Sequence, residues 1–209
     1  MNKVFIGLVF LALIFFTCWF FLRSNATGES SPKDRPLSIG GHSTTFNNSI
    51  DTLLSNYFEL ADAFVNADSV KAKTAGEKLS ASISNIPLDE LKNDTLLKKD
   101  ALVVYSTDSS SLVDIKTFSD TLTKDESLDK MRHDFASLNE SLYPFLKGIN
   151  YSGKKLYWYN CGMPFGENTS ANWISATDEH QNPYLGKYHP FYKSSMVGCG
   201  ELMDTIVAK

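Results

Sequence analysis

The hydrophobic side chains follow three patterns along the chain, and each pattern predicts a different kind of structure. An unbroken apolar run occupies residues 4–22, and between residues 49 and 149 apolar side chains recur every three or four positions. Beyond residue 150, aromatic residues alternate with glycines and prolines. The first pattern is typical of a membrane-spanning helix, the second of helices that bury one face, and the third of short strands and turns.

The N-terminal run, Val4 to Leu22, lies between Lys3 and Arg23. As a helix, these nineteen residues would span about 28 Å, close to the hydrocarbon thickness of a bilayer. A cleaved signal peptide usually has a shorter apolar stretch, and only residues 24–26 resemble a cleavage site. We therefore favour residues 1–23 as a single-pass anchor in the inner membrane, with a cleaved signal as the alternative. The flanking charges weakly favour a periplasmic domain.

Residues 24–46 are rich in Ser, Gly, Pro, Thr and Asn without an apolar period, which predicts a flexible linker. Residues 47–209 suffice for one domain with a sizeable core. Their periodicity predicts an all-α, up-and-down bundle of four to five helices. The predicted helical ranges are 49–67, 69–86, 88–105 with an interruption near residue 93, 108–123, and 128–149.

Sequence signals at the ends of these helices set their predicted limits. Asp68 is a capping residue for the second helix, and Pro87 ends it. The segment from Asp108 to Ser111 is predicted to start a separate helix. Pro144 is predicted to kink the last helix or to end it about one turn early.

Residues 151–203 form a small appendage of short strands and turns after the bundle. Lys155–Asn160 is predicted as a strand that leads into Cys161, and Met196–Leu202 as a second strand or turn that contains Cys199. If these two segments pair, the two cysteines could face each other. Trp173 is predicted to anchor the appendage in the core, and Asn182-Pro183 to form a turn.

Four sulfur-containing residues make the appendage the candidate functional part. They occur as Cys161-Gly162-Met163 and, later, Met196-Val197-Gly198-Cys199. Thiolates and thioethers are soft ligands that favour Cu(I) over harder cations. The alternative is a disulfide, which would stabilise the fold by roughly 3–4 kcal/mol, with the methionines as core residues. The spacing alone favours this second interpretation.

Composition and motifs argue against other classes of function. The net charge is -4 at pH 7 and there is no basic cluster, so we expect no nucleic-acid partner. The chain has no Cys-x-x-Cys pair, no histidine–carboxylate constellation and no Gly-rich nucleotide loop. We therefore expect a protein that is not an enzyme.

The order of short motifs in the appendage resembles a bacterial family, the domain of unknown function 3347. That family shows Cys-Pro-Met, Gly-Ala-x-Trp-Leu-Ser, Asn-Pro-Tyr-Phe-Gly, Met-Leu and Cys-Gly after a helical region. The corresponding segments here are residues 161–163, 170–175, 182–186, Met196 and residues 199–201. Two features depart from the family pattern: Gly162 replaces the proline, and residues 187–195 form a longer insert.

The resemblance implies a non-catalytic binding protein for a soft heavy-metal ion, with copper as the cofactor. Members of the family are associated with heavy-metal efflux adaptors, so adaptor or pump components are the implied partners. The implied metal ligands are Cys161, Met163, Met196 and Cys199, and the insert adds His189 as a further candidate. The alternative is an interaction or sensing module with a structural Cys161–Cys199 disulfide.

Overall fold

The computed structural model describes residues 41–93, 101–151 and 153–207. The apolar run at residues 4–22 and most of the predicted linker lie outside these residues, so the anchor stays a prediction. Within the described ranges, none of the helices is both long enough and apolar enough to cross a membrane.

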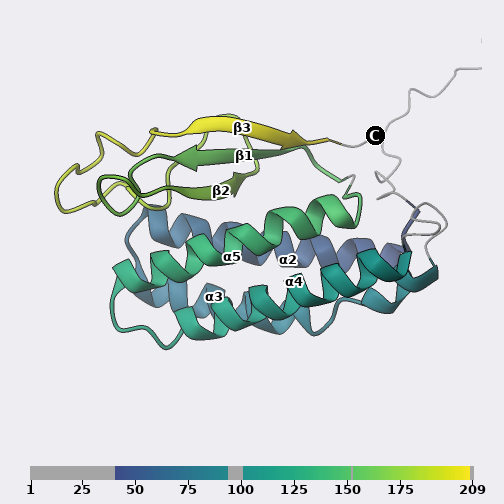
Figure 1. Ribbon diagram of the computed structural model, residues 1–209. Coiled ribbons are helices and arrows are strands. Elements are labelled where there is room, and N and C mark those ends of the chain that lie inside the picture. Colours follow the sequence, from purple (N-terminus) through teal and green to yellow (C-terminus); the bar gives the residue numbers. More distant parts are fainter. Residues whose placement is uncertain (1–40, 94–100, 152, 208–209) are drawn as a thin grey trace, which may run out of the picture. The chain divides into compact units, whose positions relative to one another are not determined.

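Four α-helices make up the bundle in the described part of the chain (Figure 1). They are α2 (Thr44–Val65), α3 (Ser69–Ile83), α4 (Ala101–Leu122) and α5 (Leu128–Gly148), and a short 3-10 helix, η1 (Leu88–Asn93), follows α3. Consecutive helices pack against each other, as the predicted up-and-down bundle requires. A three-stranded sheet follows the bundle, so the prediction of an all-α domain was too narrow.

Local capping explains where the first helices begin. The side chain of Asp68 accepts a hydrogen bond from the Lys71 amide, which confirms it as the cap of α3. Helix α2 starts at Thr44, earlier than the predicted start at residue 49, because the Ser43 hydroxyl caps it. The last three residues of the predicted linker are therefore helical, and Phe46 among them is fully buried.

Two predictions for the later helices, the break at residues 108–111 and the early end at Pro144, are wrong. Helix α4 runs without a break through the segment at residues 108–111. The hydroxyls of Ser106 and Ser110 donate to carbonyls one turn back in this helix, so these serines do not cap a new one. Pro144 lies inside α5, which continues to Gly148 and does not end early.

The core of the bundle is built from the predicted apolar faces. Phe135 of α5 lies between two aromatic rings of α2, with ring centroids 5.4 Å from Tyr57 and 5.0 Å from Phe64. All three side chains are fully buried. These contacts join the first and last helices and so close the bundle.

The sheet is antiparallel, with strand order β2-β1-β3. Its strands are β1 (Leu156–Cys161), β2 (Ala171–Ser175) and β3 (Glu201–Ile206). Strand β1 was predicted within one residue, β3 begins later than predicted, and β2 was not predicted. Figure 1 shows the sheet running along α5, where Trp158 stacks on Tyr143 at 4.3 Å between ring centroids.

Candidate functional site

The candidate site lies on the face of the sheet that is turned away from α5. Tyr159 pairs with Trp173 and Cys161 pairs with Ala171, so these four side chains share one face. Trp158 contacts α5 from the opposite face. The loop at residues 176–200 covers the first face, and Cys161 at the end of β1 is buried beneath it.

The structure places Cys161 and Cys199 close together, at the paired ends of β1 and β3. The register of β1 with β3 explains this, because Asn160 pairs with Glu201 and the next step along both strands places Cys161 opposite Gly200. Both side chains are free thiols, Cys161 buried and Cys199 half-buried. The predicted approach of the two cysteines is therefore confirmed, although Cys199 lies in the turn before β3.

The surroundings of Cys199 favour its protonated form. Burial raises the pKa of the Cys199 thiol, and the neighbouring Cys161 raises it further. Thiolates are the metal-binding and nucleophilic form of cysteine. Metal binding or nucleophilic attack by Cys199 must therefore remove a proton that this thiol holds more tightly than an exposed cysteine does.

Asn182 fixes the position of Cys199. Its fully buried side chain donates a hydrogen bond from Nδ2 to the Cys199 carbonyl at 2.8 Å. The Oδ1 atom of the same side chain accepts from the amides of Tyr184 and Leu185, as predicted for this turn. One side chain thus ties the turn at residues 182–186 to the cysteine loop.

The same turn is docked on the bundle by a buried arginine. Arg132 of α5 donates from Nε to the Pro183 carbonyl at 3.0 Å and from Nη2 to the Phe64 carbonyl at 2.8 Å. Burial lowers the pKa of Arg132 to about 10, so it stays charged at neutral pH. Gly186 has a positive φ and lies against the Val65 carbonyl, where a Cβ would come within 2.8 Å of the oxygen.

A second buried network joins β2 to the helices. The Tyr57 hydroxyl donates to Asn139 Oδ1 at 2.6 Å and accepts from the Ile174 amide at 2.9 Å. The Tyr184 hydroxyl donates to the carbonyl of Asn172. Burial raises the pKa of both tyrosines far above the ordinary range, so both hydroxyls keep their protons. These hydrogen bonds thereby connect α2 and α5 to strand β2.

The two methionines near the cysteines have different environments. Met163 lies in the loop between β1 and β2 and its side chain is 43% exposed. Met196 is half-buried and packs against the core, and its carbonyl accepts a hydrogen bond from the Cys199 amide at 3.0 Å. Both remain predicted thioether ligands.

His189 lies in the insert, with its Nδ1 facing the amides of Phe191 and Tyr192 at 3.3 Å each. Within residues 41–93, 101–151 and 153–207, no three histidine, cysteine, aspartate or glutamate side chains are grouped so that they could hold a metal ion. His189 is thus not brought together with the two cysteines. A metal held by the pair would need thioether or exogenous ligands for any further coordination.

His180 is not among the site residues predicted from the sequence, where it was expected to be exposed, but the structure places it half-buried beside the cysteine loop. Its ring stacks on Tyr159 at 3.9 Å, and its Nε2 is buried without a hydrogen-bond partner among the residues described. This nitrogen and the Trp173 ring both lie against Gly200, where a Cβ would come within 3.1 Å of the nitrogen and 2.4 Å of the ring. Only glycine therefore fits after Cys199.

A comparison with protein families matches residues 53–154 to a model described as "Protein of unknown function (DUF3347)". The helical region of this chain belongs to the DUF3347 family. The match confirms the family suspected from the sequence. It covers the helices and ends before Cys161, so the metal ligands implied by the later motifs stay predictions. No curated protein and no solved structure matches the chain.

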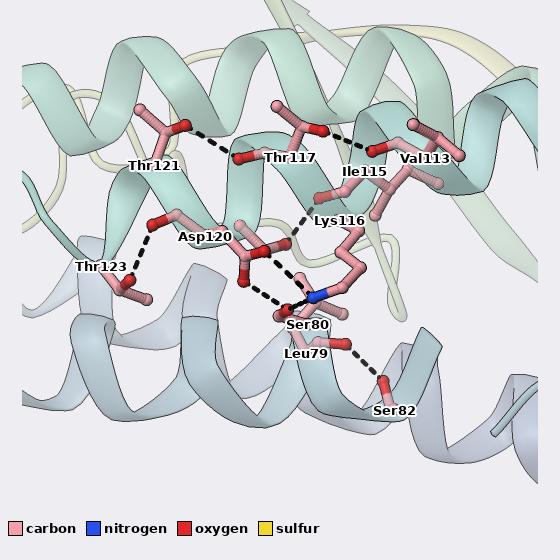
Figure 2. Close-up of polar contacts among 11 residues, drawn as sticks. Leu79, Ser80, Ser82, Val113, Ile115, Lys116, Thr117, Asp120, Thr121 and Thr123 are labelled. Atoms are coloured by element: carbon pink, nitrogen blue, oxygen red, sulfur yellow. Dashed lines mark hydrogen bonds and ion pairs between the residues drawn. The ribbon is translucent and has the colours of Figure 1, made fainter. Parts of the chain in front are cut away.

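The DUF3347 helices also carry a polar cluster, which Figure 2 shows between α3 and α4. The Ser80 hydroxyl donates to Asp120 Oδ1 at 2.5 Å, and Lys116 Nζ donates to the Ser80 oxygen at 2.7 Å and to Asp120 Oδ2 at 3.0 Å. The hydrogen bond from Ser80 and the charge of Lys116 lower the pKa of Asp120. Since Lys116 is paired with a carboxylate and Ser80 is buried, the cluster is a helix clamp and not a nucleophile with its base.

Proposed function

We propose that this domain binds a soft metal ion, best matched by Cu(I), between the thiolates of Cys161 and Cys199, without catalysing a reaction. The observation that carries the proposal is the pairing of β1 with β3, which brings two cysteines that are distant in the chain close together. Two converging thiolates favour Cu(I) over harder cations. Metal binding would displace the thiol protons, so its affinity should rise with pH.

The two nearby methionines complete the proposed site. Met163 and Met196 each lie within three residues of one cysteine, and their unbranched side chains can change rotamer at low cost. His189 is not part of the proposed set, because it does not group with the thiols. The proposed setting is a periplasmic domain tethered to the inner membrane by residues 1–23, acting with components of a heavy-metal efflux system.

A Cu(I) competition titration tests this function. The full-length protein, with Cys18 replaced by alanine, would compete with a chromogenic Cu(I) chelator under reducing, oxygen-free conditions. We expect one bound Cu(I) per chain and at least a roughly hundred-fold weaker affinity for Cys161→Ser and for Cys199→Ser. Met203→Leu is the matched control, since Met203 is exposed and outside the proposed site. Unchanged binding in both cysteine variants would refute the proposal.

The same closeness of the two cysteines supports a second function, an interaction or sensing module stabilised by a Cys161–Cys199 disulfide. In that case each cysteine variant should lose roughly 3–4 kcal/mol of stability under oxidising conditions and show no metal-dependent phenotype. Thiol titration of the Cys18→Ala protein isolated from its native compartment separates the two functions. Two titratable thiols favour the metal site, and none favours the disulfide.

A further inference from the structure

We propose that Cys199 and Cys161 form an ordered thiol–disulfide exchange pair, in which Cys199 attacks a disulfide of another molecule and Cys161 resolves the resulting mixed disulfide. This inference does not depend on metal binding. It goes beyond a static structural disulfide, because it assigns a different role to each sulfur and a direction to the reaction.

The two thiols differ in access to solvent. Cys161 ends the central strand of the sheet and is only 1% exposed, so an external disulfide cannot reach its sulfur. Cys199 lies in the turn before β3 and is half-buried. Access is one of the determinants of exchange rates. Cys199 is therefore the entry point, and Cys161 can be oxidised only through it.

The closeness of the two cysteines supplies the second step. When the Cys199 sulfur carries a partner group, Cys161 lies close to it, because the register of β1 with β3 places Cys161 opposite Gly200, the residue after Cys199. Cys161 is held in the ladder of β1 with β2, where it pairs with Ala171. Cys199 is held by Asn182 and by the hydrogen bond from its own amide to Met196. The resolving step therefore takes place between two residues that the fold already holds close together.

The reaction balances with a disulfide RSSR as the oxidant. The Cys199 thiolate attacks one sulfur, the S–S bond of RSSR breaks, and the departing RS⁻ takes up the proton that Cys199 released. The Cys161 thiolate then attacks the Cys199 sulfur, the bond to the remaining RS group breaks, and a second RSH leaves with the proton of Cys161. Two electrons pass from the pair to RSSR, which ends as two thiols.

The absence of a Cys-x-x-Cys motif does not oppose this inference. That motif places two thiols together through one turn of local backbone, whereas here the pairing of β1 with β3 does so between distant segments. The lack of a Cys-x-x-Cys motif is therefore no evidence against thiol–disulfide exchange in this chain.

Stoichiometric reaction with dithiodipyridine, an aromatic disulfide that releases a chromogenic thiol, tests the order. The full-length chain with Cys18→Ala would be used in mild detergent with a chelator, so that metal binding cannot affect the result. With one equivalent of reagent, we expect two equivalents of released thiol and a protein mass without adduct. Cys161→Ser should release one equivalent and retain the adduct on Cys199. Cys199→Ser should react at least roughly ten-fold more slowly than Cys161→Ser.

The order of attack can also be measured on the chain that keeps both Cys161 and Cys199, so the result does not depend on whether the single variants fold. Samples quenched early with acid would be digested and mapped, and the first adduct should be on the peptide that contains Cys199. A first adduct on Cys161, or equal reaction rates of the two single variants with native circular dichroism, would overturn the order. A lasting adduct without an internal disulfide would overturn the resolving role of Cys161.

Discussion

The helical bundle and the sheet with its covering loop are held together by different interactions. In the bundle, apolar side chains such as Phe135 and Leu142 are fully buried, and helices that follow one another in the chain pack together. In the sheet region, buried polar groups such as Arg132 and Asn182 join segments that are distant in the chain. A periodic apolar pattern therefore suffices to specify the bundle, whereas the place of Cys199 depends on a few individual hydrogen bonds.

Of the changes considered, replacing Trp173 with alanine should destabilise the sheet and its covering loop most. Trp173 is 2% exposed and packs between Tyr159 and Tyr184, with ring centroids at 5.4 and 6.1 Å. Removing so large a buried side chain should lower the free energy of unfolding by about 3–5 kcal/mol. Urea unfolding followed by circular dichroism measures this loss, and the rate of Cys199 alkylation shows whether the loop has opened.

Leu142→Ala in the bundle core is the control for Trp173→Ala. It should cost about 2–5 kcal/mol but leave the alkylation rate of Cys199 unchanged below the unfolding transition. Equal effects of both variants on that rate would contradict the separation between the two regions.

Asn182→Ala should have a smaller effect that is confined to the cysteine loop. It leaves the Cys199 carbonyl and the amides of Tyr184 and Leu185 without their partner, which should cost about 1–3 kcal/mol. Alkylation of Cys199 should become faster while the helix signal stays unchanged. Asn85→Ala is the matched control, because Asn85 is an exposed asparagine near the end of α3. An alkylation rate of Cys199 equal to that of this control would argue against a role of Asn182 in holding the cysteine loop.

Asp108→Asn should have the smallest effect, and it should stabilise the bundle. Asp108 is 1% exposed, its Oδ2 has no hydrogen-bond partner in the described ranges, and its carboxyl lies against Gly148. Burial raises its pKa from 3.8 to about 7. At pH 8 the variant should be more stable by about 1–2 kcal/mol, less than the full shift implies, because a buried amide also lacks partners.

The effect of Asp108→Asn on the free energy of unfolding should depend on pH. A raised carboxyl pKa leaves stability intact below pH 3.8 and removes it progressively as the pH rises through about 7. The stability advantage of Asp108→Asn should therefore widen between pH 5 and pH 8 in urea unfolding. Asp114→Asn, at an exposed position of the same helix, should show no such widening. A constant difference across this range would rule out ionisation of Asp108 as the cause.

Sequence reasoning predicted the helices well because their signals are local. Asp68 caps α3 and the residues after Leu122 end α4, as their residue types predict. The same reasoning failed at Asp108–Ser111, because serines that resemble caps can donate to carbonyls of their own helix. It also failed at Ser43, whose position next to a buried Phe46 lies in a stretch of linker-like composition.

The approach of Cys161 and Cys199 was predictable, but the details of their surroundings were not. Strand β1 and the cysteine-containing turn could be recognised from aromatic and glycine residues. Strand β2 has only five residues, and the contact of His180 with Gly200 spans a long loop. No local signal marks Arg132 as the residue that binds the Pro183 carbonyl, because the partners become neighbours only after folding.

The closeness of Gly200 to the Trp173 ring gives the protein a built-in optical reporter. Indole emission responds to nearby sulfur, to heavy ions and to changes in local polarity, so an event at the adjacent cysteine should alter the fluorescence of Trp173. With Trp19 and Trp158 replaced by phenylalanine, Trp173 would be the single tryptophan, and occupancy of the site could be followed in real time by selective excitation of its indole, without any added dye.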